Sequence, residues 1–585
     1  MIRSRFLLAL LLLTAGACKD SPVAPTPAAK DYRVGELHRF NVNSQSSCDS
    51  PDYRTGRVMA VTQRAIVVAD TANPRGAGTF SDAEYQGFAT TFDDLVWPTV
   101  TENFGTPQDV DRNGKVIIFF TRAVNELTPR GQNWFVGGYF FSRDLFPTRD
   151  EAGFKACAGS NYAEMFYMLV PDPSGTVNGN SRSKDRELRA TVAVLAHEFQ
   201  HLINASRRLY VVRAGGNDWN EISWLNEGLS HIAEELLGYR TSSLAPRQNI
   251  DAQRLSTSPT EQSAFFEYQA QNFSRLAAYL QNPEGQSLIG PDSLATRGAT
   301  WQFLRYAADR KGGSEAALWR SLVDSGVSGI ANLRSALGAE PMEWIQDWAV
   351  SIYTDDTAPG VESRFQQQSW NFRSIYPRLR NSGGQTVYAS YPLKTTVLEN
   401  RSRSVEIAAG SAAFLRFGVP AAGRAEIRLE AGAASCLTSG PALSLSVGAV
   451  HTVTADQAGT LCLDGGAAGA EFTYIPFFAS ETASGRRVIE ITAAGVIPVL
   501  GPPSPALIPS RDAALLAAGD VKHEHGARPD AGWEMRLRER EARELAPRVR
   551  GGIDQHVEIL PRGTSFSIAD VTDPLRLRIS IVRTK

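Results

Sequence analysis

The sequence has no excess of charge of one sign. Its 585 residues include 60 lysines and arginines against 62 aspartates and glutamates, so the formal net charge is only −2. A protein that binds nucleic acid or a membrane surface through charge carries a marked basic excess. We therefore expect no nucleic-acid partner. A hydrophobic content of 43% and a charged content of 21% are ordinary for a soluble globular protein, and the length allows roughly two to four domains.

Cysteine is scarce, and no two cysteines have the CxxC spacing of a structural zinc site. There are five, and Cys18 is the odd one. The other four allow three connectivities. Two lie in the N-terminal half and two in the C-terminal half, which favours the pairs Cys48–Cys157 and Cys436–Cys462 and agrees with an exported protein.

After its N-terminus, the sequence has no apolar stretch long enough to cross a membrane. Arg3 and Arg5 form a basic start, and the apolar run at residues 6–13 has the length of a signal-peptide core. Residues 14–18, TAGAC, resemble a bacterial lipobox. The resemblance implies cleavage before Cys18 and a lipid on its sulfur.

A lipid on Cys18 would anchor the exported chain in the bacterial cell envelope, at the outer membrane or the cell surface, or leave it to be released outside the cell. An ordinary secretory signal followed by an incidental cysteine is the alternative. Residues 19–30 are rich in proline and alanine, as a flexible tether is.

The stretch LAHEFQHLI, residues 195–203, contains an HExxH motif. Its apolar residues recur at three- and four-residue steps, which indicates a helix. His197 and His201 lie one turn apart, so both imidazoles can reach one tetrahedral zinc ion. Glu198 lies beside them, where a carboxylate can take a proton from water. The alternative is a pair of histidines on a solvated helix face.

A second predicted helix, residues 224–236, places Glu227, His231 and Glu234 on its polar face. A catalytic zinc needs three protein ligands and one open position. Glu227 is the predicted third ligand. Asp218, in the glycine-rich loop before this helix, is the competing candidate.

Together, HEFQH and WLNEG resemble the gluzincin metallopeptidases, and more closely the hyicolysin-like family of secreted neutral zinc peptidases. The metzincin continuation is absent, because Asn204 and Arg207 stand where that pattern has glycine and histidine. The resemblance covers roughly residues 33–378. It implies one Zn²⁺ per chain, a zincin-like domain with a helical lobe, and a protein or peptide substrate.

The resemblance also implies roles around the zinc. In thermolysin-like enzymes a carboxylate four residues after the glutamate ligand orients the first histidine, but here that position is His231, so Glu234 is the candidate for this role. His231 and Tyr210 are candidates to donate a hydrogen bond to the oxyanion. One of two predicted strands, residues 136–141 or 164–170, would border the cleft and pair with the substrate backbone.

The turn at residues 109–114, DVDRNG, resembles the start of a calcium loop. An EF-hand would need a carboxylate near residue 120, where Phe120 stands. We therefore interpret it as an Asn-Gly turn that leads into a buried strand at residues 115–120. Calcium remains the weaker alternative.

We predict an α+β fold: a zincin-like catalytic domain with a helical lobe, followed by an all-β, sandwich-like domain. The predicted divisions are a lipoprotein signal peptide (1–17), a tether (18–32), the peptidase domain (33–378), the β domain (385–500), and a tail with a linker, a charged helix and terminal strands (501–585).

The predicted activity is that of a lipid-anchored zinc endopeptidase with Glu198 as general base. Two alternatives belong to other classes. One is a surface lipoprotein that binds a partner and carries an inactive peptidase domain, against which the intact Glu198 argues. The other is a zinc hydrolase of a non-peptide amide.

Overall fold

The computed structural model describes residues 30–44, 48–132, 134–151, 154, 156–214, 219–357, 360–380, 385–429, 436–437, 440–454, 459–483, 485–499, 521–523 and 576–585. The predicted features outside these residues are the signal peptide, the lipid site Cys18, most of the tether, the competing ligand Asp218, and, in the tail, the linker, the charged helix (533–545) and the first terminal strand (557–560). The predicted α+β class is confirmed, with a helical region and a C-terminal β-rich region.

The N-terminal part is built on a seven-stranded mixed sheet in the order β1-β2-β3-β4-β6-β5-β16. Its strands are β1 (Leu37–Asn41), β2 (Tyr53–Val61), β3 (Ala65–Asp70), β4 (Val116–Phe120), β6 (Met165–Met168), β5 (Phe135–Phe140) and β16 (Val521–His523). β3, β4 and β6 are parallel, whereas β5 runs antiparallel to β6. The continuous apolar run VIIFF forms the central strand β4 and is wholly buried, as predicted.

Three helices follow the early strands: α1 (Asp82–Thr91), α2 (Trp97–Phe104) and α3 (Arg122–Glu126). Ser81 and Glu84 cap α1 reciprocally, in the S-x-x-E pattern of a capping box. The helical path continues through a π-helical turn, η1 (Phe92–Val96), into α2. Pro98 has no N–H to donate to this preceding turn, in which the N–H of Trp97 bonds instead to the carbonyl of Phe92.

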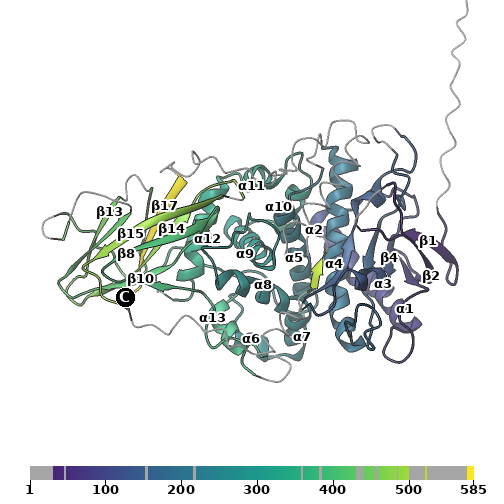
Figure 1. Cartoon of the computed structure of the whole chain (residues 1–585), viewed down its shortest axis with the longest axis horizontal. Helices are drawn as coiled ribbons and strands as arrows, with labels where there is room; N and C mark the ends of the chain where they lie inside the picture. Colours follow the sequence, from purple (N-terminus) through teal and green to yellow (C-terminus); the bar gives the residue numbers. More distant parts are fainter. Residues whose placement is uncertain are drawn as a thin grey trace, which may run out of the picture.

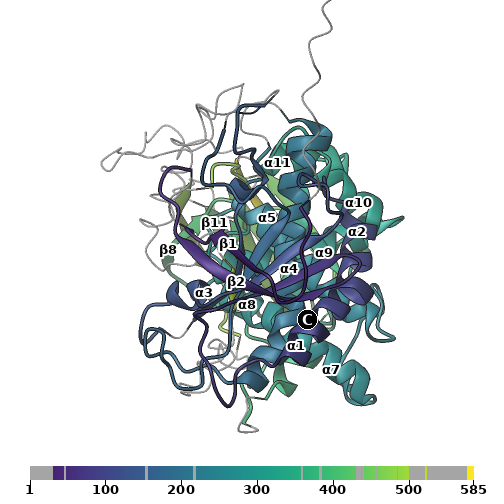
Figure 2. The same ribbon diagram turned by 90° about the vertical axis from the view of Figure 1, so that its right-hand side faces the viewer.

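The HExxH helix is α4 (Lys184–Ser206), and it packs against β5 and β6. The following segment was predicted as a loop, but it begins with a π-helical turn, η3 (Arg207–Val212). The WLNEG helix is α5 (Ser223–Arg240), which packs against α4. Figure 2, which views the molecule from the N-terminal end, shows β1 and β2 in front of α4 and α5.

The helical lobe contains α6 (Ala252–Ser256), α7 (Pro259–Tyr268), α8 (Ala270–Leu280), α9 (Leu294–Lys311), α10 (Glu315–Val323), α11 (Gly329–Leu337), α12 (Pro341–Thr354) and α13 (Phe372–Ile375). It occupies the middle of the molecule, between the N-terminal sheet and the β-rich end (Figure 1). Within the described part of the chain, no helix is long and apolar enough to cross a membrane.

The C-terminal region contains two sheets, ordered β12-β17-β14-β10-β7, with β9 also paired to β14, and β13-β11-β15-β8. The strands are β7 (Thr396–Val397), β8 (Ser402–Ala408), β9 (Ser411–Ala412), β10 (Leu415–Val419), β11 (Arg424–Leu429), β12 (Val450–Thr454), β13 (Thr460–Asp464), β14 (Ala470–Phe478), β15 (Arg486–Ala494) and β17 (Leu577–Arg583). β17 lies between β12 and β14, so the last strand of the chain completes this β region.

Both predicted disulfides are present. Cys48–Cys157 joins the segment after β1 to the segment before β6, with 4.8 Å between the Cα atoms. Cys436–Cys462 lies inside the β region, with 6.0 Å between the Cα atoms. The second bridge closes a short loop, and in the loop-entropy model such a bridge stabilises the fold by roughly 3 kcal/mol.

The helical lobe and the β region share buried contacts. α12 packs against β9, β14 and β17. Tyr353 of α12 stacks on Phe414, with ring centroids 6.2 Å apart. Phe477 and Val582 belong to the same buried cluster as the N-terminal core, while the space between the two β sheets holds a second cluster. The hydrophobic core therefore continues from the N-terminal part into the β region.

Candidate metal centre

Helices α4 and α5 bring the two predicted histidine ligands and Glu227 together. The Nε2 atoms of His197 and His201 lie 3.1 Å apart. One carboxylate oxygen of Glu227 lies 3.3 Å from His197 Nε2, and the other lies 3.8 Å from His201 Nε2. All three side chains are at most 1% exposed. The alternative of two histidines on a solvated helix face is therefore wrong.

These separations fit a zinc ion. With Zn–N and Zn–O distances of about 2.0–2.2 Å, two ligand atoms on a tetrahedral ion lie roughly 3.3 Å apart. The observed separations of 3.1, 3.3 and 3.8 Å bracket that value. Burial lowers the pKa of His197 well below its usual range, and the neighbouring His201 adds to this, so His197 is neutral and can offer a lone pair.

A hydrogen bond sets which nitrogen of His197 carries the proton. His197 Nδ1 lies 2.8 Å from a Glu234 carboxylate oxygen, which can only accept, so the proton is on Nδ1. His197 Nε2 is then unprotonated and lies opposite His201 Nε2, where one cation can bind both nitrogens. The Ser230 hydroxyl donates to Gln200 at 2.6 Å and contacts the His201 ring, at 3.1 Å from Nδ1 and 3.3 Å from Nε2.

Two arginines, which the sequence analysis did not identify, border this cluster. Arg297 of α9 lies 3.1 Å from the Glu227 carboxylate and forms a bidentate pair with Asp292, with both distances 2.7 Å. Arg275 of α8 lies 3.6 Å from Glu234. Nothing in the sequence separates these two arginines from the other charged residues of the helical lobe, such as Arg305 of the same helix α9.

Two glycines let these arginines reach the centre. A Cβ on Gly228, the residue after Glu227, would lie 2.5 Å from the Thr300 side chain of α9. A Cβ on Gly298 would lie 2.2 Å from the backbone of Arg275. The close crossings of α5, α8 and α9 therefore depend on glycine at both positions.

Glu198, the predicted general base, extends from α4 to the strand β5. It is fully buried. A Cβ on Gly138 of β5 would lie 3.1 Å from Glu198 Cγ and 2.9 Å from the Tyr167 carbonyl oxygen. The side-chain stem of Glu198 therefore packs against the backbone of β5 at Gly138, which has no side chain.

Of the remaining predicted residues, His231 and Glu234 lie beside His197, whereas Tyr210 does not. His231 lies beside His197, with ring centroids 4.8 Å apart, and its Nδ1 is 3.1 Å from Glu234. Burial, together with the charges of Arg275 and Arg297, lowers the pKa of His231. His197, His231 and Glu234 form a second group whose ligand atoms could meet at one ion. The hydroxyl of Tyr210 instead donates to the carbonyl of Leu145, and Tyr210 belongs to neither set of possible metal ligands.

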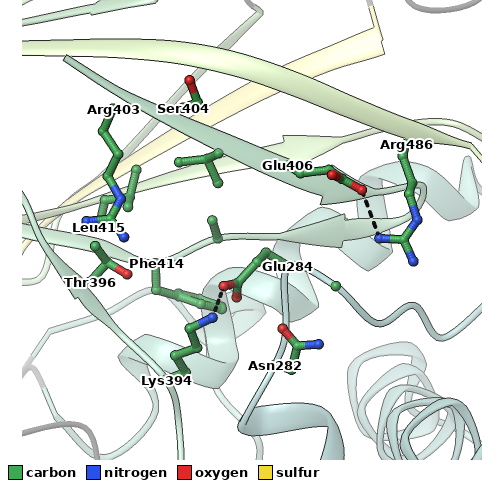
Figure 3. A pocket seen from close by; sticks show the side chains of 13 residues that line it. Asn282, Glu284, Lys394, Thr396, Arg403, Ser404, Glu406, Phe414, Leu415 and Arg486 are labelled. Atoms are coloured by element: carbon green, nitrogen blue, oxygen red, sulfur yellow. Dashed lines mark hydrogen bonds and ion pairs between the residues drawn. The ribbon is translucent and has the colours of Figure 1, made fainter.

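A cavity of about 320 Å³ lies elsewhere, between the helical lobe and the β region (Figure 3). The figure shows Lys394 paired with Glu284 and Arg486 paired with Glu406. The charges of these four residues compensate one another, and the cavity lies apart from the histidine cluster. We assign it no catalytic role.

A comparison with known proteins bears on the histidine cluster. The chain is similar to a neutral metalloprotease. That relative, neutral metalloprotease ShpI of Staphylococcus hyicus, is 31% identical over 219 residues. The matched region is 37% of this chain and 46% of the relative, so the chain spans less than half of the relative's length. No family model matches the chain.

Proposed function

We propose that this protein is a zinc-dependent peptidase whose ion is held by His197, His201 and Glu227. One observation carries the proposal: two imidazole nitrogens and a carboxylate converge at the spacing of tetrahedral ligands. The similarity to a neutral metalloprotease supports it. The HEFQH and WLNEG motifs support a place among the gluzincins and the hyicolysin-like family.

The chain's own groups then have distinct roles. Bound zinc would supply a Lewis acid that polarises the scissile carbonyl and lowers the pKa of water. Glu198 would accept the proton of the attacking water and pass it to the leaving amine. Glu234 would hold His197 in the required tautomer, and Arg297 would hold the Glu227 carboxylate. His231 is the better supported donor to the oxyanion, because the Tyr210 hydroxyl is bonded to a backbone carbonyl.

We further propose that peptide substrates bind along the edge of β5. β16 pairs there in parallel, and His523 is in register with Gly138, which lies against Glu198. This pairing supports the capacity of that edge to accept an extended chain next to the general base. Because β16 belongs to this same chain, a substrate on that edge would have to displace it.

The cellular location and the domain division are also proposals. The disulfides Cys48–Cys157 and Cys436–Cys462 support an oxidising compartment. A lipid on Cys18 would anchor the chain to the cell envelope. Cys18→Ser should move the protein from the membrane fraction to the soluble fraction, and unchanged fractionation would contradict the anchor. We retain residues 33–378 as the peptidase unit and 385–500 as the β unit, with the addition of β17.

The experiment that tests the proposed reaction compares the wild type with Glu198→Gln. Zinc content and cleavage of casein and of non-peptide amides are measured on both. We expect about one zinc per chain in each protein, and a rate of casein cleavage lower by roughly 10²–10⁴-fold in the variant.

Each alternative class gives a different result in this experiment. Zinc binding without hydrolysis by the wild type would favour a binding lipoprotein. Hydrolysis of non-peptide amides alone would favour an amidase. Equal casein cleavage by both proteins would contradict the role of Glu198.

A further inference from the structure

A second group of possible metal ligands lies apart from the histidine cluster. It consists of Asp109 and Asp111, in the loop before β4, and Glu164, directly before β6. One oxygen of each carboxylate lies within 4.8 Å of the others. Calcium binds oxygen at 2.3–2.6 Å, so two oxygens on one calcium ion lie at most about 5 Å apart. The three carboxylates can therefore meet at one ion.

Glu164 gives an independent indication that a cation belongs there. Its side chain is only 2% exposed. Oε1 accepts a hydrogen bond from Val110 N at 2.7 Å, whereas Oε2 is buried without a hydrogen-bond partner among the described residues. Leaving a buried carboxylate oxygen unsatisfied is costly. Burial also raises the pKa of Glu164 to about 8 and that of Asp111 to about 6.

The nearest candidate for a built-in counter-ion is Lys30, whose charge acts on Asp111 and Glu164. Its ammonium group, however, donates hydrogen bonds to the backbone carbonyls of Asn161 and Tyr162, at 2.7 and 3.0 Å. These bonds direct its protons to uncharged oxygens. Among the described residues, no donor therefore reaches Glu164 Oε2.

The loop is shaped so that its two aspartates face Glu164. Asp109 accepts from the backbone N–H groups of Asn113 and Gly114, at 3.1 and 3.0 Å. Arg112 and Gly114 have φ values of 61° and 70°, which fold the chain back on itself. β4 and β6 are adjacent parallel strands, with Ile117 opposite Met165, so the residue before β6 comes to lie beside the residues before β4.

Because β4 and β6 are adjacent, a carboxylate from another strand can complete the site, although residue 120 of the loop's own sequence is a phenylalanine. An EF-hand would place its closing carboxylate within the same loop, near Phe120, which is fully buried in β4. The structure offers Glu164 instead, across the sheet.

We propose that Asp109, Asp111 and Glu164 form a calcium site. The three side chains offer only oxygen, which suits a hard cation rather than zinc. Calcium fits better than magnesium, because magnesium demands near-ideal octahedral geometry at about 2.0–2.1 Å. Asp109 is exposed, which leaves one side open to water ligands.

The ion would stabilise the C-terminal end of the HExxH helix, α4. Gln108, in the same loop, donates its N–H to the Ser206 hydroxyl at the last residue of α4, at 2.8 Å. Arg207, directly after α4, donates to the carbonyl of Thr106 at 2.7 Å. Calcium at Asp109 and Asp111 would thereby fix the loop that holds α4, without contacting the zinc ligands.

Calcium binding can be measured on the full zinc-loaded chain by titration calorimetry with CaCl₂ and, separately, MgCl₂. We expect one calcium per chain, bound more tightly than magnesium, and a rise in the melting temperature of roughly 2–4 °C in millimolar CaCl₂. Glu164→Gln and Asp111→Asn should each weaken calcium binding by at least about tenfold. Their zinc content should stay at that of the wild type.

Asp94→Asn is the matched control, because Asp94 is an exposed aspartate in the same N-terminal region. It should bind calcium as the wild type does. Absence of a calcium heat and of a thermal shift in the wild type would overturn the proposal. So would unchanged calcium binding in both cluster variants, since the ion would then be elsewhere. Loss of zinc together with calcium would show that the variants disturb the whole fold. Lys30→Met would then provide the test, and its calcium affinity should equal or exceed that of the wild type. A loss of calcium affinity in Lys30→Met would contradict the site.

Discussion

At the scale of single residues, the least expected feature is a pair of buried arginines, each of which contacts a glutamate of the metal centre. Arg297 contacts Glu227, and Arg275 contacts Glu234. A carboxylate ligand needs a fixed orientation, and an ion pair with a buried guanidinium supplies it. The metal centre therefore extends over α8 and α9 as well as over the two helices that carry the motifs.

The contribution of Arg297 can be measured with two substitutions. Arg297→Met should weaken zinc affinity by about 10–100-fold, because the Glu227 carboxylate loses its partner. Arg297→Lys should recover part of the affinity, since it keeps the charge but cannot form the bidentate pair with Asp292. Competition with a chelator of known affinity gives the values. Equal zinc affinity in all three proteins would contradict this role.

The sequence predicted much of the centre and missed part of it for a physical reason. One helical turn determines how His197, Glu198 and His201 lie, and this could be inferred from spacing alone. Glu234 was foreseen as the partner of His197, and the 2.8 Å contact agrees with that role. Arg297 could not be foreseen, because its contact with Glu227 depends on how closely α5 and α9 cross.

At the scale of helices and strands, local signals were informative wherever one residue pattern dominated. The apolar run of β4 and the cap of α1 are examples. The π-helical turns η1 and η3 were missed, since nothing in their composition separates them from the adjacent helices. The interpretation of residues 109–114 as a turn leading into β4 was correct as local structure, but the nearby Glu164 comes from another strand.

The strand β5 offers a test of how Glu198 is positioned. In Gly138→Ala, the new Cβ would meet the Tyr167 carbonyl oxygen at 2.9 Å and Glu198 Cγ at 3.1 Å. Overpacking of this kind costs about 1–3 kcal/mol, and displacing a catalytic group by about 1 Å can cost 10²-fold in rate. We expect a folded, zinc-bound protein with kcat lower by roughly that factor.

Gly87→Ala is the control for that substitution. Gly87 is exposed in α1, and an added Cβ there meets nothing within 4 Å. Its stability should be unchanged or slightly raised, and its activity should equal that of the wild type. If Gly138→Ala retains full activity, Glu198 does not depend on contact with β5.

At the scale of the whole molecule, strands near the C-terminal end of the sequence pair with strands that lie much earlier in it. β17, at residues 577–583, completes a sheet begun near residue 396, and β16 pairs with β5. Sequence patterns report local periodicity, so they predicted a strand at the position of β17 but predicted neither β16 nor the partner of either strand. The predicted boundary near residue 380 marks a change of architecture, although the buried core continues across it.

The central claim is that one zinc ion is held by His197, His201 and Glu227. It is tested most directly by anomalous diffraction at the zinc absorption edge, on crystals of the zinc-loaded protein. The account predicts a single peak about 2.0–2.2 Å from both Nε2 atoms and from a Glu227 oxygen. A peak between His197, His231 and Glu234, or one bound by Asp218 in place of Glu227, would contradict it.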